Sequence, residues 1–318
     1  MVGDDGRVTT FHPDELPIDA TLVRRLVDSA FPTYAEHEVV ALPRSGSSNA
    51  LFRLGDDALV RLPRQPGGGV SLVKEAAWLP SVAAGVSVAV PEILELGEPD
   101  LGYPEPWAIT SWLPGRRLSP PALAPAPAPL GGDGGQLARD LATFVAEIRS
   151  LEVPGRAAGD ESLAWYRGLP LWQLDAEFRD AAAQCRALGT ALDIDHALDV
   201  WGSAVEASRQ VERVDTWFHG DLLTENLLVD DSGGLVGVLD FGGLAIGDPT
   251  VDLVVAWEAL DAAGRHEFRR ALHVDDAAWT TGRGWALLIA MITFPYYGQS
   301  MPARCADRMV MARAALAG

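Results

Sequence analysis

Most of the residues that could carry out a reaction lie in two neighbouring segments, His219 to Asn226 and Asp240 to Gly242. In order along the chain they supply a carboxylate (Asp221), an amide (Asn226) and a second carboxylate (Asp240). Phosphoryl transfer from a nucleotide needs such a set, because one carboxylate orients the attacking hydroxyl while an amide and a carboxylate hold Mg²⁺ on the phosphates. We therefore predict Asp221 as the catalytic base and the other two as magnesium ligands.

The segment between the two proposed ligands predicts a β-hairpin. Two apolar runs, 227–229 and 235–239, flank the turn Asp230-Asp231-Ser232-Gly233-Gly234. A hairpin returns the chain to its starting point, so it would bring Asp240 close to Asn226. Both side chains offer oxygen donors, which suit Mg²⁺ because this hard cation takes few protein ligands.

Three polar residues of the first segment have alternative interpretations. His219 could act as a base or bind a metal, but no second histidine lies nearby, so we expect its imidazole to brace the loop backbone by hydrogen bonds. Glu225 either contacts a substrate or is a solvated loop carboxylate. Asp221 could form only an Asx-turn or a helix cap, the ordinary meaning of a loop aspartate. The matched Asn226 and Asp240 favour the base.

The composition is that of a globular protein with an acidic surface. Of 318 residues, 48% are hydrophobic and 22% charged, and the formal net charge is −19. This charge disfavours nucleic acid as a partner, since such binding depends on basic contacts to phosphate. An acidic surface can concentrate a cationic substrate, or it can serve solubility alone.

The start of the chain and its cysteines favour a soluble cytoplasmic protein. The first six residues lack the basic start and apolar core of a signal peptide. The longest apolar stretch, around 285–294, is shorter than a membrane span. Cys185 and Cys305 are too few for a disulfide framework and do not have the spacing of metal ligands.

The first third of the sequence predicts a small antiparallel sheet crossed by one helix. Apolar residues at helical spacing come first, then short apolar runs broken by glycine and proline, and Pro80 should end or kink the second helix. The expected helices are 20–31 and 70–84, and the expected strands are 38–42, 49–54, 58–62, 92–97 and 106–112.

The remainder predicts a mainly helical region. Leu113-Pro114-Gly115 marks a turn and a boundary between two lobes. The following residues, 114–135, are rich in proline, alanine and glycine, and we expect a flexible surface loop there. The expected helices are 136–151, 160–187, 194–212, 250–263, 265–273, 282–293 and 302–316.

One short segment between the first two predicted strands could approach a nucleotide. Ser47, Ser48 and Asn49 follow Gly46, and small residues let backbone N–H groups come close to a triphosphate. A glycine and serine hairpin turn is the ordinary alternative. The sequence contains no Walker A motif, which removes the basis for a P-loop enzyme.

These motifs resemble those of the aminoglycoside phosphotransferase family, the antibiotic and small-molecule branch of the protein-kinase-like fold. The family pattern is His-Gly-Asp-x-x-x-x-Asn, then Asp-Phe-Gly, then Asp-Pro-x-x-Asp-Leu. The sequence matches it at 219–226, 240–242 and 248–253. The lobe order also agrees along nearly the whole chain.

The resemblance implies a protein-kinase-like α+β fold of two lobes. Residues 1–113 would form a small, nucleotide-binding sheet lobe with a hinge at about 110–113, and residues 114–318 a larger, mainly helical lobe for catalysis and substrate binding. The implied reaction is Mg²⁺-dependent transfer of the γ-phosphate of ATP or GTP to a hydroxyl.

The resemblance also assigns residues. Arg61 would grip the nucleotide phosphates and Glu75 would orient it, although most of the family has lysine at the first position, with a different reach and geometry. The Ser111 carbonyl and the Leu113 N–H would meet the purine. Supports of the catalytic loop or a helix cap would be His219, Asp248 and Asp252.

The acceptor should bind in the helical lobe, facing the base. Carboxylates would suit protonated amines and aromatic rings would stack on sugars, bases or macrocycles, although core packing and solvation are the ordinary roles of such residues. The candidate contacts are Glu225, Trp257, Glu258, Asp261 and Tyr296.

We therefore expect an O-phosphotransferase whose acceptor is a hydroxyl of an antibiotic of the aminoglycoside, macrolide, peptide or nucleoside type, conferring resistance or self-protection. Neither nucleic acid nor a membrane is expected as a partner. The alternative enzyme is a kinase for a small metabolite such as choline, homoserine or methylthioribose. A nucleotide-binding pseudokinase is the alternative outside enzymes, and Arg61 is the feature in its favour.

Overall fold

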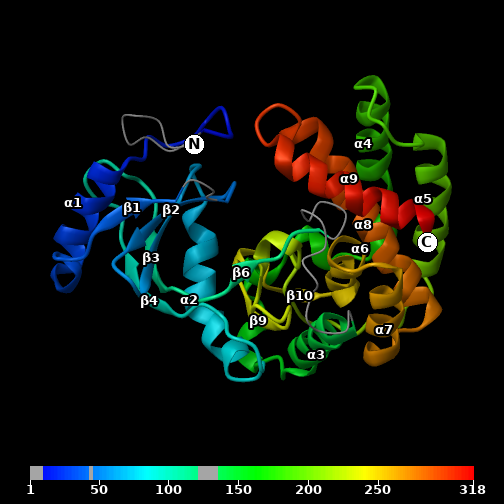
Figure 1. Cartoon of the computed structure of the whole chain (residues 1–318), viewed down its shortest axis with the longest axis horizontal. Helices are drawn as coiled ribbons and strands as arrows, with labels where there is room; N and C mark the ends of the chain where they lie inside the picture. Colours follow the sequence, from blue (N-terminus) through cyan, green and yellow to red (C-terminus); the bar gives the residue numbers. More distant parts are fainter. Residues whose placement is uncertain (1–9, 43–45, 121–134) are drawn as a thin grey trace. The chain divides into compact units, whose positions relative to one another are not determined.

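The computed structural model describes residues 10–42, 46–120 and 135–318 (Figure 1). It divides into two compact units. Unit 1 runs to Ala84 and continues from Val90 to Pro114, and unit 2 comprises Gly85–Ala89 and Gly115–Gly318. Most of the predicted flexible loop, residues 121–134, lies outside the described residues. The α+β class, with a small antiparallel sheet and a helical C-terminal part, is confirmed.

Unit 1 is built on a five-stranded antiparallel sheet with the strand order β1-β2-β3-β5-β4. Successive side chains of each strand point to opposite faces of the sheet. Phe52 and Val60 are paired on one face, whereas Leu51 is paired with Arg61 on the other. The strands are β1 (Val39–Ala41), β2 (Asn49–Leu54), β3 (Ala58–Pro63), β4 (Ile93–Gly97) and β5 (Trp107–Ser111).

Two helices of unit 1 lie on opposite sides of this sheet (Figure 1). Helix α1 (Ala20–Ala30) begins where the Asp19 side chain accepts a hydrogen bond from the Leu22 N–H at 2.8 Å. Its apolar stripe packs in one core with Phe52 and Val60. Burying each large apolar side chain contributes about 1.5–3 kcal/mol, which explains why this amphipathic helix was predictable.

The second helix of unit 1, α2 (Gly69–Ala83), continues past Pro80. Of the two effects expected of Pro80, to end or to kink the helix, the first is therefore wrong. Proline removes one backbone hydrogen bond of the helix, but Leu79 and Val82 on either side of it are 2% and 0% exposed. Their packing keeps the last turn helical.

Unit 2 consists mainly of helices. The predicted ranges are close to the observed ones with three exceptions. Of 160–187 only 175–187 is α-helical, 250–263 begins with a 3₁₀ helix and is interrupted at 260–261, and 282–293 starts six residues after the observed helix does. No helix in the described ranges is long and apolar enough to cross a membrane. The helices are α3 (Gly135–Ser150), α4 (Asp175–Ala187), α5 (Ile194–Ser208), α6 (Val255–Ala259), α7 (Ala262–Leu272), α8 (Asp276–Tyr297) and α9 (Pro302–Ala317).

The predicted helix 160–187 was wrong for its first half. Three short 3₁₀ segments, Glu161–Leu163, Tyr166–Gly168 and Leu171–Leu174, come before α4. Pro170 restricts the residue before it to an extended conformation, and Leu169 has ψ 149°. Gly168 approaches the backbone of β10 so closely that its carbonyl accepts the Asp248 N–H at 2.9 Å. These contacts hold the segment against β10, which pairs with the strand that precedes residues 219–226.

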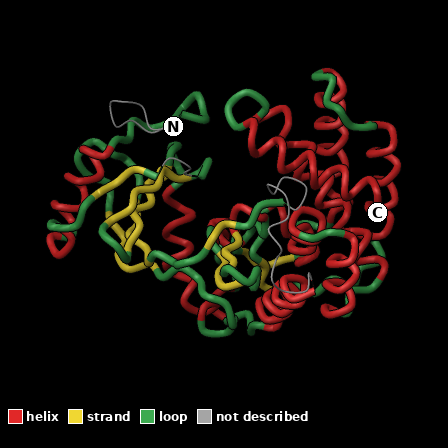
Figure 2. Tube along the Cα trace, viewed as in Figure 1, coloured by secondary structure: helices red, strands yellow, loops and turns green. Residues whose placement is uncertain are grey.

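The strands of unit 2 form two small sheets among the helices (Figure 2). The predicted hairpin is present as β8 and β9, and an unpredicted strand, β6, pairs with β8. A second unpredicted strand, β10, pairs with β7 and leads to the segment around Asp248. The strands are β6 (Arg116–Arg117), β7 (Thr216–Phe218), β8 (Leu227–Val229), β9 (Leu235–Val238) and β10 (Ala245–Gly247).

Candidate active site

The candidate catalytic loop begins where β7 ends. Gly220 has φ +81°, in the left-handed region that favours glycine. A Cβ at this position would lie 2.8 Å from the Gly243 carbonyl oxygen and 2.5 Å from the Trp165 ring. A side chain at residue 220 would therefore displace the loop, and glycine is needed for both conformation and space.

Asp252 and His219 hold this loop through hydrogen bonds to its backbone. The carboxylate of Asp252 accepts the His219 N–H and the Gly220 N–H, both at 2.7 Å. The His219 ring accepts the Asp221 N–H on Nδ1 at 3.1 Å, so its proton lies on Nε2, which contacts the Leu239 carbonyl at 3.0 Å. Burial raises the pKa of Asp252, although the two backbone donors favour its ionised form. The imidazole thus makes the backbone hydrogen bonds of a brace.

Asp221 presents a partly exposed carboxylate held by two side chains. Arg167 donates to its Oδ1 at 2.5 Å, and the Asn226 amide donates to its Oδ2 at 3.2 Å. The side chain remains 28% exposed, so a reactant can reach it. Burial opposes ionisation, but the guanidinium groups of Arg167 and Arg308 hold the pKa of Asp221 below its usual range. The carboxylate is therefore ionised at neutral pH.

The hairpin brings the proposed magnesium ligands together through the backbone. The Leu239 N–H donates to the Asn226 carbonyl at 2.8 Å. Asp240 directly follows Leu239, so this bond holds its backbone next to that of Asn226. Asp240 has φ 59°, a conformation that is uncommon for residues other than glycine and is found at functional sites. The Asn226 amide nitrogen is turned to the Asp221 carbonyl at 2.9 Å, so the amide oxygen points elsewhere.

The donor set fits a magnesium ion. One amide oxygen and one carboxylate are hard oxygen donors, and Mg²⁺ is usually bound by one or two carboxylates together with phosphate oxygens and waters. Within the described ranges no group of three or more His, Cys, Asp or Glu side chains is arranged to hold a metal. A cation that needs a full protein cage is therefore a poorer fit to these residues than Mg²⁺.

In unit 1, the predicted partners Arg61 and Glu75 form a closed ion pair. The Arg61 guanidinium makes two hydrogen bonds to the Glu75 carboxylate, at 2.6 and 3.0 Å. Their side chains are 7% and 0% exposed. This bidentate geometry holds the arginine rigidly on β3 and would differ for lysine.

The segment from Gly46 to Asn49 is held by residues that the sequence analysis did not select. His12 contacts the Ser47 carbonyl through Nε2 at 3.0 Å, and Arg64 donates to the Gly46 carbonyl at 3.1 Å. Ser47 and Asn49 are buried and Ser48 is exposed. His12, near the start of the described chain, and Arg64, directly after β3, therefore hold this turn.

The predicted hinge residues lie at the end of β5. Ser111 exchanges backbone and side-chain hydrogen bonds with Glu92, whose carbonyl accepts the Ser111 N–H at 2.9 Å. Leu113 follows two residues later and is partly exposed. Trp112 between them packs under the guanidinium of Arg53 at 3.9 Å.

The proposed acceptor contacts differ in their surroundings. Glu225 lies in the catalytic loop and pairs with arginines of α9. Glu258 and Trp257 are 0% and 1% exposed, so both lie in the core. Asp261 accepts the Gly264 N–H at 2.8 Å as the cap of α7, and Tyr296 is 60% exposed.

Asp248 is a helix cap. Its buried carboxylate accepts the Thr250 N–H at 2.9 Å, at the start of the 3₁₀ helix Pro249–Val254. The same helix carries Asp252, so this cap fixes the residue that braces the catalytic loop. Burial raises the pKa of the Asp248 carboxyl.

Three arginines of the site were missed. Arg167 reaches Asp221 from 54 residues away, and Arg308 reaches Glu225 from 83 residues away. Arg304, one turn from Arg308 on α9, also pairs with Glu225, at 3.0 Å. The aromatic pair before Arg167 was a weak signal, but nothing in the local sequence indicates which carboxylate each arginine meets.

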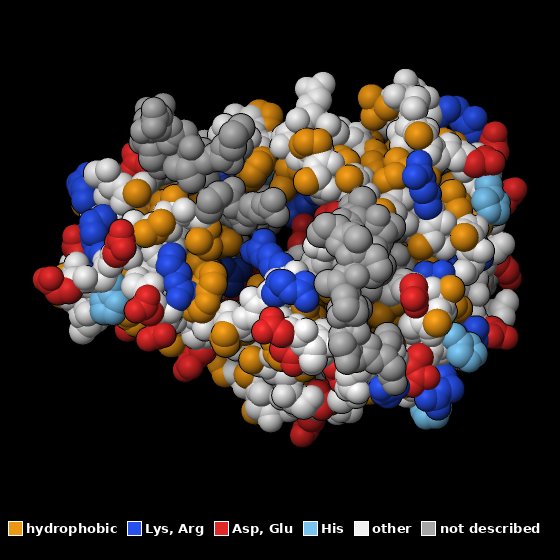
Figure 3. Space-filling view, viewed as in Figure 1, with side chains coloured by type: hydrophobic (Ala, Val, Ile, Leu, Met, Phe, Trp, Pro, Cys, Tyr) orange, Lys and Arg blue, Asp and Glu red, His pale blue; other side chains and the backbone are white. Residues whose placement is uncertain are grey.

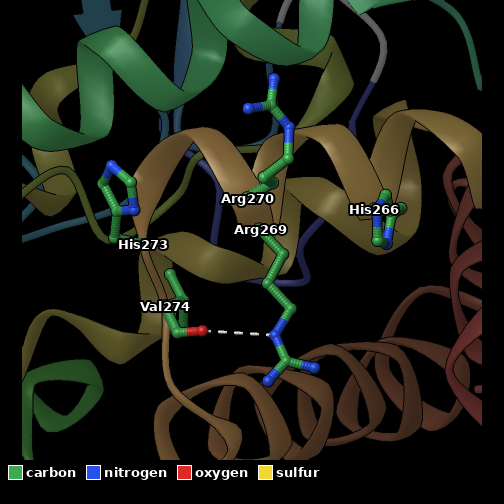
Figure 4. Close-up of a pocket in the computed structure, with 5 residues that line it drawn as sticks. All are labelled: His266, Arg269, Arg270, His273 and Val274. Carbon is green, nitrogen blue, oxygen red and sulfur yellow. Dashed lines mark hydrogen bonds between the residues drawn. The ribbon is translucent and has the colours of Figure 1, made fainter.

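One hollow of unit 2 lies away from these residues, on α7 and the turn after it (Figure 4). Its side chains diverge: Arg269 donates to the Val274 carbonyl at 3.2 Å, and His266 and His273 point to opposite sides. Arg270 pairs with Glu267 instead. Because these groups do not converge on one point, the hollow lacks the features of a reactant site.

Comparisons with known proteins agree with the motifs. The model of a phosphotransferase enzyme family matches residues 39–286. Among solved structures, the GDP complex of aminoglycoside 2'-phosphotransferase-IIIa is 20% identical, covers 94% of this chain and 99% of that chain, and superposes with a TM-score of 0.67. The macrolide 2'-phosphotransferase MphH from Brachybacterium faecium is 19% identical, with coverages of 94% and 98% and a TM-score of 0.60.

A third structure, the ADP-bound aminoglycoside phosphotransferase APH(2'')-Ib, is 15% identical, with coverages of 93% and 98% and a TM-score of 0.61. At these identities the likeness establishes the protein-kinase-like fold. No curated protein matches the sequence.

Proposed function

The chain belongs to the phosphotransferase enzyme family, and on that premise we propose that it transfers the γ-phosphate of a nucleoside triphosphate to a hydroxyl group of an antibiotic. The observation that carries this proposal is the Asp221 carboxylate, held by Arg167 and Asn226 yet 28% exposed. The names of the similar structures, which are aminoglycoside and macrolide phosphotransferases, support an antibiotic as the acceptor.

Asp221 acts as the base. Its ionised carboxylate accepts the hydrogen bond of the acceptor hydroxyl and so orients the oxygen for in-line attack on phosphorus. As the new O–P bond forms and the bond to the leaving nucleoside diphosphate breaks, the hydroxyl proton passes to the carboxylate. Arg167 and Asn226 keep the carboxylate in one orientation, which supports attack from a fixed position.

Asn226 and Asp240 would hold Mg²⁺. When bound, this ion neutralises charge on the nucleotide phosphates. The amide nitrogen of Asn226 is bonded to the Asp221 carbonyl, so the amide oxygen points away from Asp221. The hydrogen bond from the Leu239 N–H to the Asn226 carbonyl holds the backbone next to Asp240 against Asn226. These two contacts support a role as ligands rather than as loop caps.

The nucleotide would be held by unit 1. Arg61, oriented by Glu75, would contact the phosphates, and backbone N–H groups of 47–49 would approach them. Ser111 and Leu113 would meet the base. ADP and GDP in similar structures support either ATP or GTP as the co-substrate, and we infer that the reaction takes place in the cytoplasm, where both are available.

The test is release of nucleoside diphosphate by the purified full-length chain with Mg²⁺ and either ATP or GTP. The acceptor panel contains an aminoglycoside, a macrolide, a cationic peptide and a nucleoside antibiotic, together with choline, homoserine and methylthioribose. Turnover with an antibiotic, lost in Asp221→Asn, is the expected result. Turnover with metabolites alone would replace the acceptor class, and nucleotide binding without turnover of any acceptor would indicate a pseudokinase.

A further inference from the structure

Three arginines surround the proposed catalytic loop, and we refer to Arg167, Arg304 and Arg308 as the arginine cluster. Arg167 donates to Asp221 and to the Gly220 carbonyl, at 2.5 and 2.8 Å. Arg308 is 2% exposed and lies close enough for its charge to lower the pKa of Asp221. The electrostatic surroundings of the base are thus set by cations of the protein itself.

Two carboxylates beside the cluster, Glu225 and Glu258, are paired with its arginines. Glu225 accepts hydrogen bonds from Arg304 at 3.0 Å and Arg308 at 2.9 Å. Glu258 is fully buried, accepts the Thr224 N–H at 2.7 Å with one oxygen, and pairs with Arg308 through the other. An ammonium group of an acceptor would have to displace Arg308 to reach Glu258, at the cost of a buried ion pair. At Glu225, which is 24% exposed, it would compete with two guanidinium groups.

Aromatic rings accompany the arginine cluster. The Arg167 guanidinium lies over the Trp165 ring at 4.6 Å and the Tyr166 ring at 5.6 Å. The Arg304 guanidinium lies over Tyr297 at 5.0 Å, and Tyr296 meets that ring at 4.6 Å. Tyr166 and Tyr296 are 37% and 60% exposed. Exposed rings beside these arginines can pack against apolar or sugar surfaces of an acceptor.

The protein is acidic overall, but the carboxylates of this loop, Asp221 and Glu225, are paired with arginines. The net charge is −19, but acidic and basic side chains are interspersed over the visible face (Figure 3). Asp221 and Glu225 of the loop and the neighbouring Glu258 each pair with an arginine of the cluster. Asp307 lies near Glu258 and Glu225 as a further carboxyl, and its pKa is raised to about 6 by burial and by these two neighbours. The long-range attraction of a cation to the protein is therefore not matched by an ammonium site at the base.

We propose that the acceptor is a largely apolar hydroxyl compound with at most one amine, and that the arginine cluster discriminates against acceptors with several ammonium groups. This inference rests on the proposed function, because it concerns the acceptor of the same site. It selects among the antibiotic types that the sequence left open, and it disfavours the aminoglycosides that the net charge alone would favour.

The test measures equilibrium binding, so that it does not depend on turnover. Kanamycin, a polyamine, and erythromycin, a mainly apolar macrolide with one amine, are titrated into the full-length chain with Mg²⁺ and ADP at about 0.15 M salt, where long-range attraction is screened. The wild type should bind erythromycin at least about tenfold more tightly than kanamycin.

The variants change the cluster at its most accessible member. Arg304→Gln should tighten kanamycin binding about fivefold and Arg304→Glu more strongly, because each removes repulsion of nearby ammonium groups. Arg304→Lys keeps the charge and should leave kanamycin binding unchanged. Arg186→Gln removes an exposed arginine that pairs with Asp195 on another part of unit 2 and should shift it by less than about twofold.

The inference stands only if both results are obtained. Tighter binding of kanamycin than of erythromycin by the wild type, absence of binding of both, or an Arg304→Gln affinity equal to that of the Arg186→Gln control overturns it. Diphosphate release is measured in parallel. If the expected binding pattern appears without turnover of any acceptor, the proposed function fails and the proposed selectivity of the site remains.

Discussion

Two arginine–carboxylate pairs, one in each unit, use the same chemical groups in opposite ways. Arg61 and Glu75 are 7% and 0% exposed and joined by two hydrogen bonds. Arg167 and Asp221 are 13% and 28% exposed and joined by one. In the first pair the carboxylate orients a buried arginine. In the second the arginine orients a carboxylate that stays accessible to solvent. The two pairs therefore differ in geometry and exposure rather than in residue type.

The surroundings explain the difference. Glu75 projects from α2 onto the polar face of the sheet and satisfies both of its oxygens with one guanidinium. Asp221 lies on a loop whose backbone is held by Asp252 and His219, so the conformation of the loop does not depend on its side chain alone. A carboxylate that stays partly exposed can bind a substrate.

The largest effect on activity should come from the partly exposed pair, Arg167 and Asp221. Asp221→Ala should lower kcat by about a thousandfold or more, because the acceptor hydroxyl loses its orienting base. Nucleotide affinity should stay within about threefold, since the nucleotide is proposed to contact other residues. Coupled diphosphate release and nucleotide titration measure the two effects.

The exposed Asp231→Asn in the hairpin turn is the matched control, with the same charge lost a few residues away. Turnover by Asp221→Ala close to that of this control would show that the base was assigned wrongly.

Substitution in the buried pair, Arg61 and Glu75, should lower the stability of the protein. Glu75→Gln leaves the Arg61 guanidinium buried without a counter-charge, and removing one partner of a buried pair costs about 3 kcal/mol in the free energy of unfolding. The Michaelis constant for the nucleotide should also rise. Urea denaturation and nucleotide titration test both expectations.

Glu206→Gln provides the control for this variant, because Glu206 pairs with Arg209 on the surface at 3.0 Å, with side chains 67% and 52% exposed. Its unfolding free energy should change by less than about 0.5 kcal/mol. Equal effects of the two substitutions would remove the distinction between buried and exposed pairs.

A smaller effect on activity should follow from substitution of Arg167, the partner of Asp221. Arg167→Gln should lower kcat by about thirtyfold with little change in the nucleotide Michaelis constant, because the base becomes less well positioned. Arg167→Lys should restore part of the rate, since an ammonium can bond the carboxylate but not in the fixed geometry of a guanidinium. Steady-state kinetics of the two variants distinguish this role from folding, and Arg179→Gln is the control. Equal kcat values for Arg167→Gln and the wild type would refute positioning.

The smallest effect concerns a carboxyl outside both pairs. Burial, with Glu258 and then Glu225 nearby, raises the pKa of Asp307 to about 6, against the pull of Arg308 and Arg304. The folded state therefore holds this proton more tightly than the unfolded state, and the contribution to stability falls as the pH rises from about 4 to about 6.

Asp307→Asn should remove this dependence. At pH 8 the variant should be more stable by about 1 kcal/mol, after allowance for solvent screening, and at pH 4 the gain should vanish. Urea denaturation at both pH values measures it. An equal gain at both values would mean that ionisation of Asp307 is not its source.

Sequence patterns predicted the parts of the fold that depend on local periodicity. Helix α1 and strands β2 and β3 lie within about a residue of their expected ranges, because apolar spacing and turn residues set them. The helix expected at 160–187 broke into 3₁₀ segments where Gly168 packs against β10 and Pro170 restricts the chain. Such contacts with distant strands leave no periodic signal.

The sequence by itself determined the order of Asp221, Asn226 and Asp240 and the hairpin that connects the last two. Both are local, because a hairpin is closed by its own turn and strands. Only the tertiary structure decided which cations meet these groups. Arg167 and Arg308 come from segments 54 and 83 residues away from their partners, and such pairings follow from how the 3₁₀ segments and α9 pack on the catalytic loop.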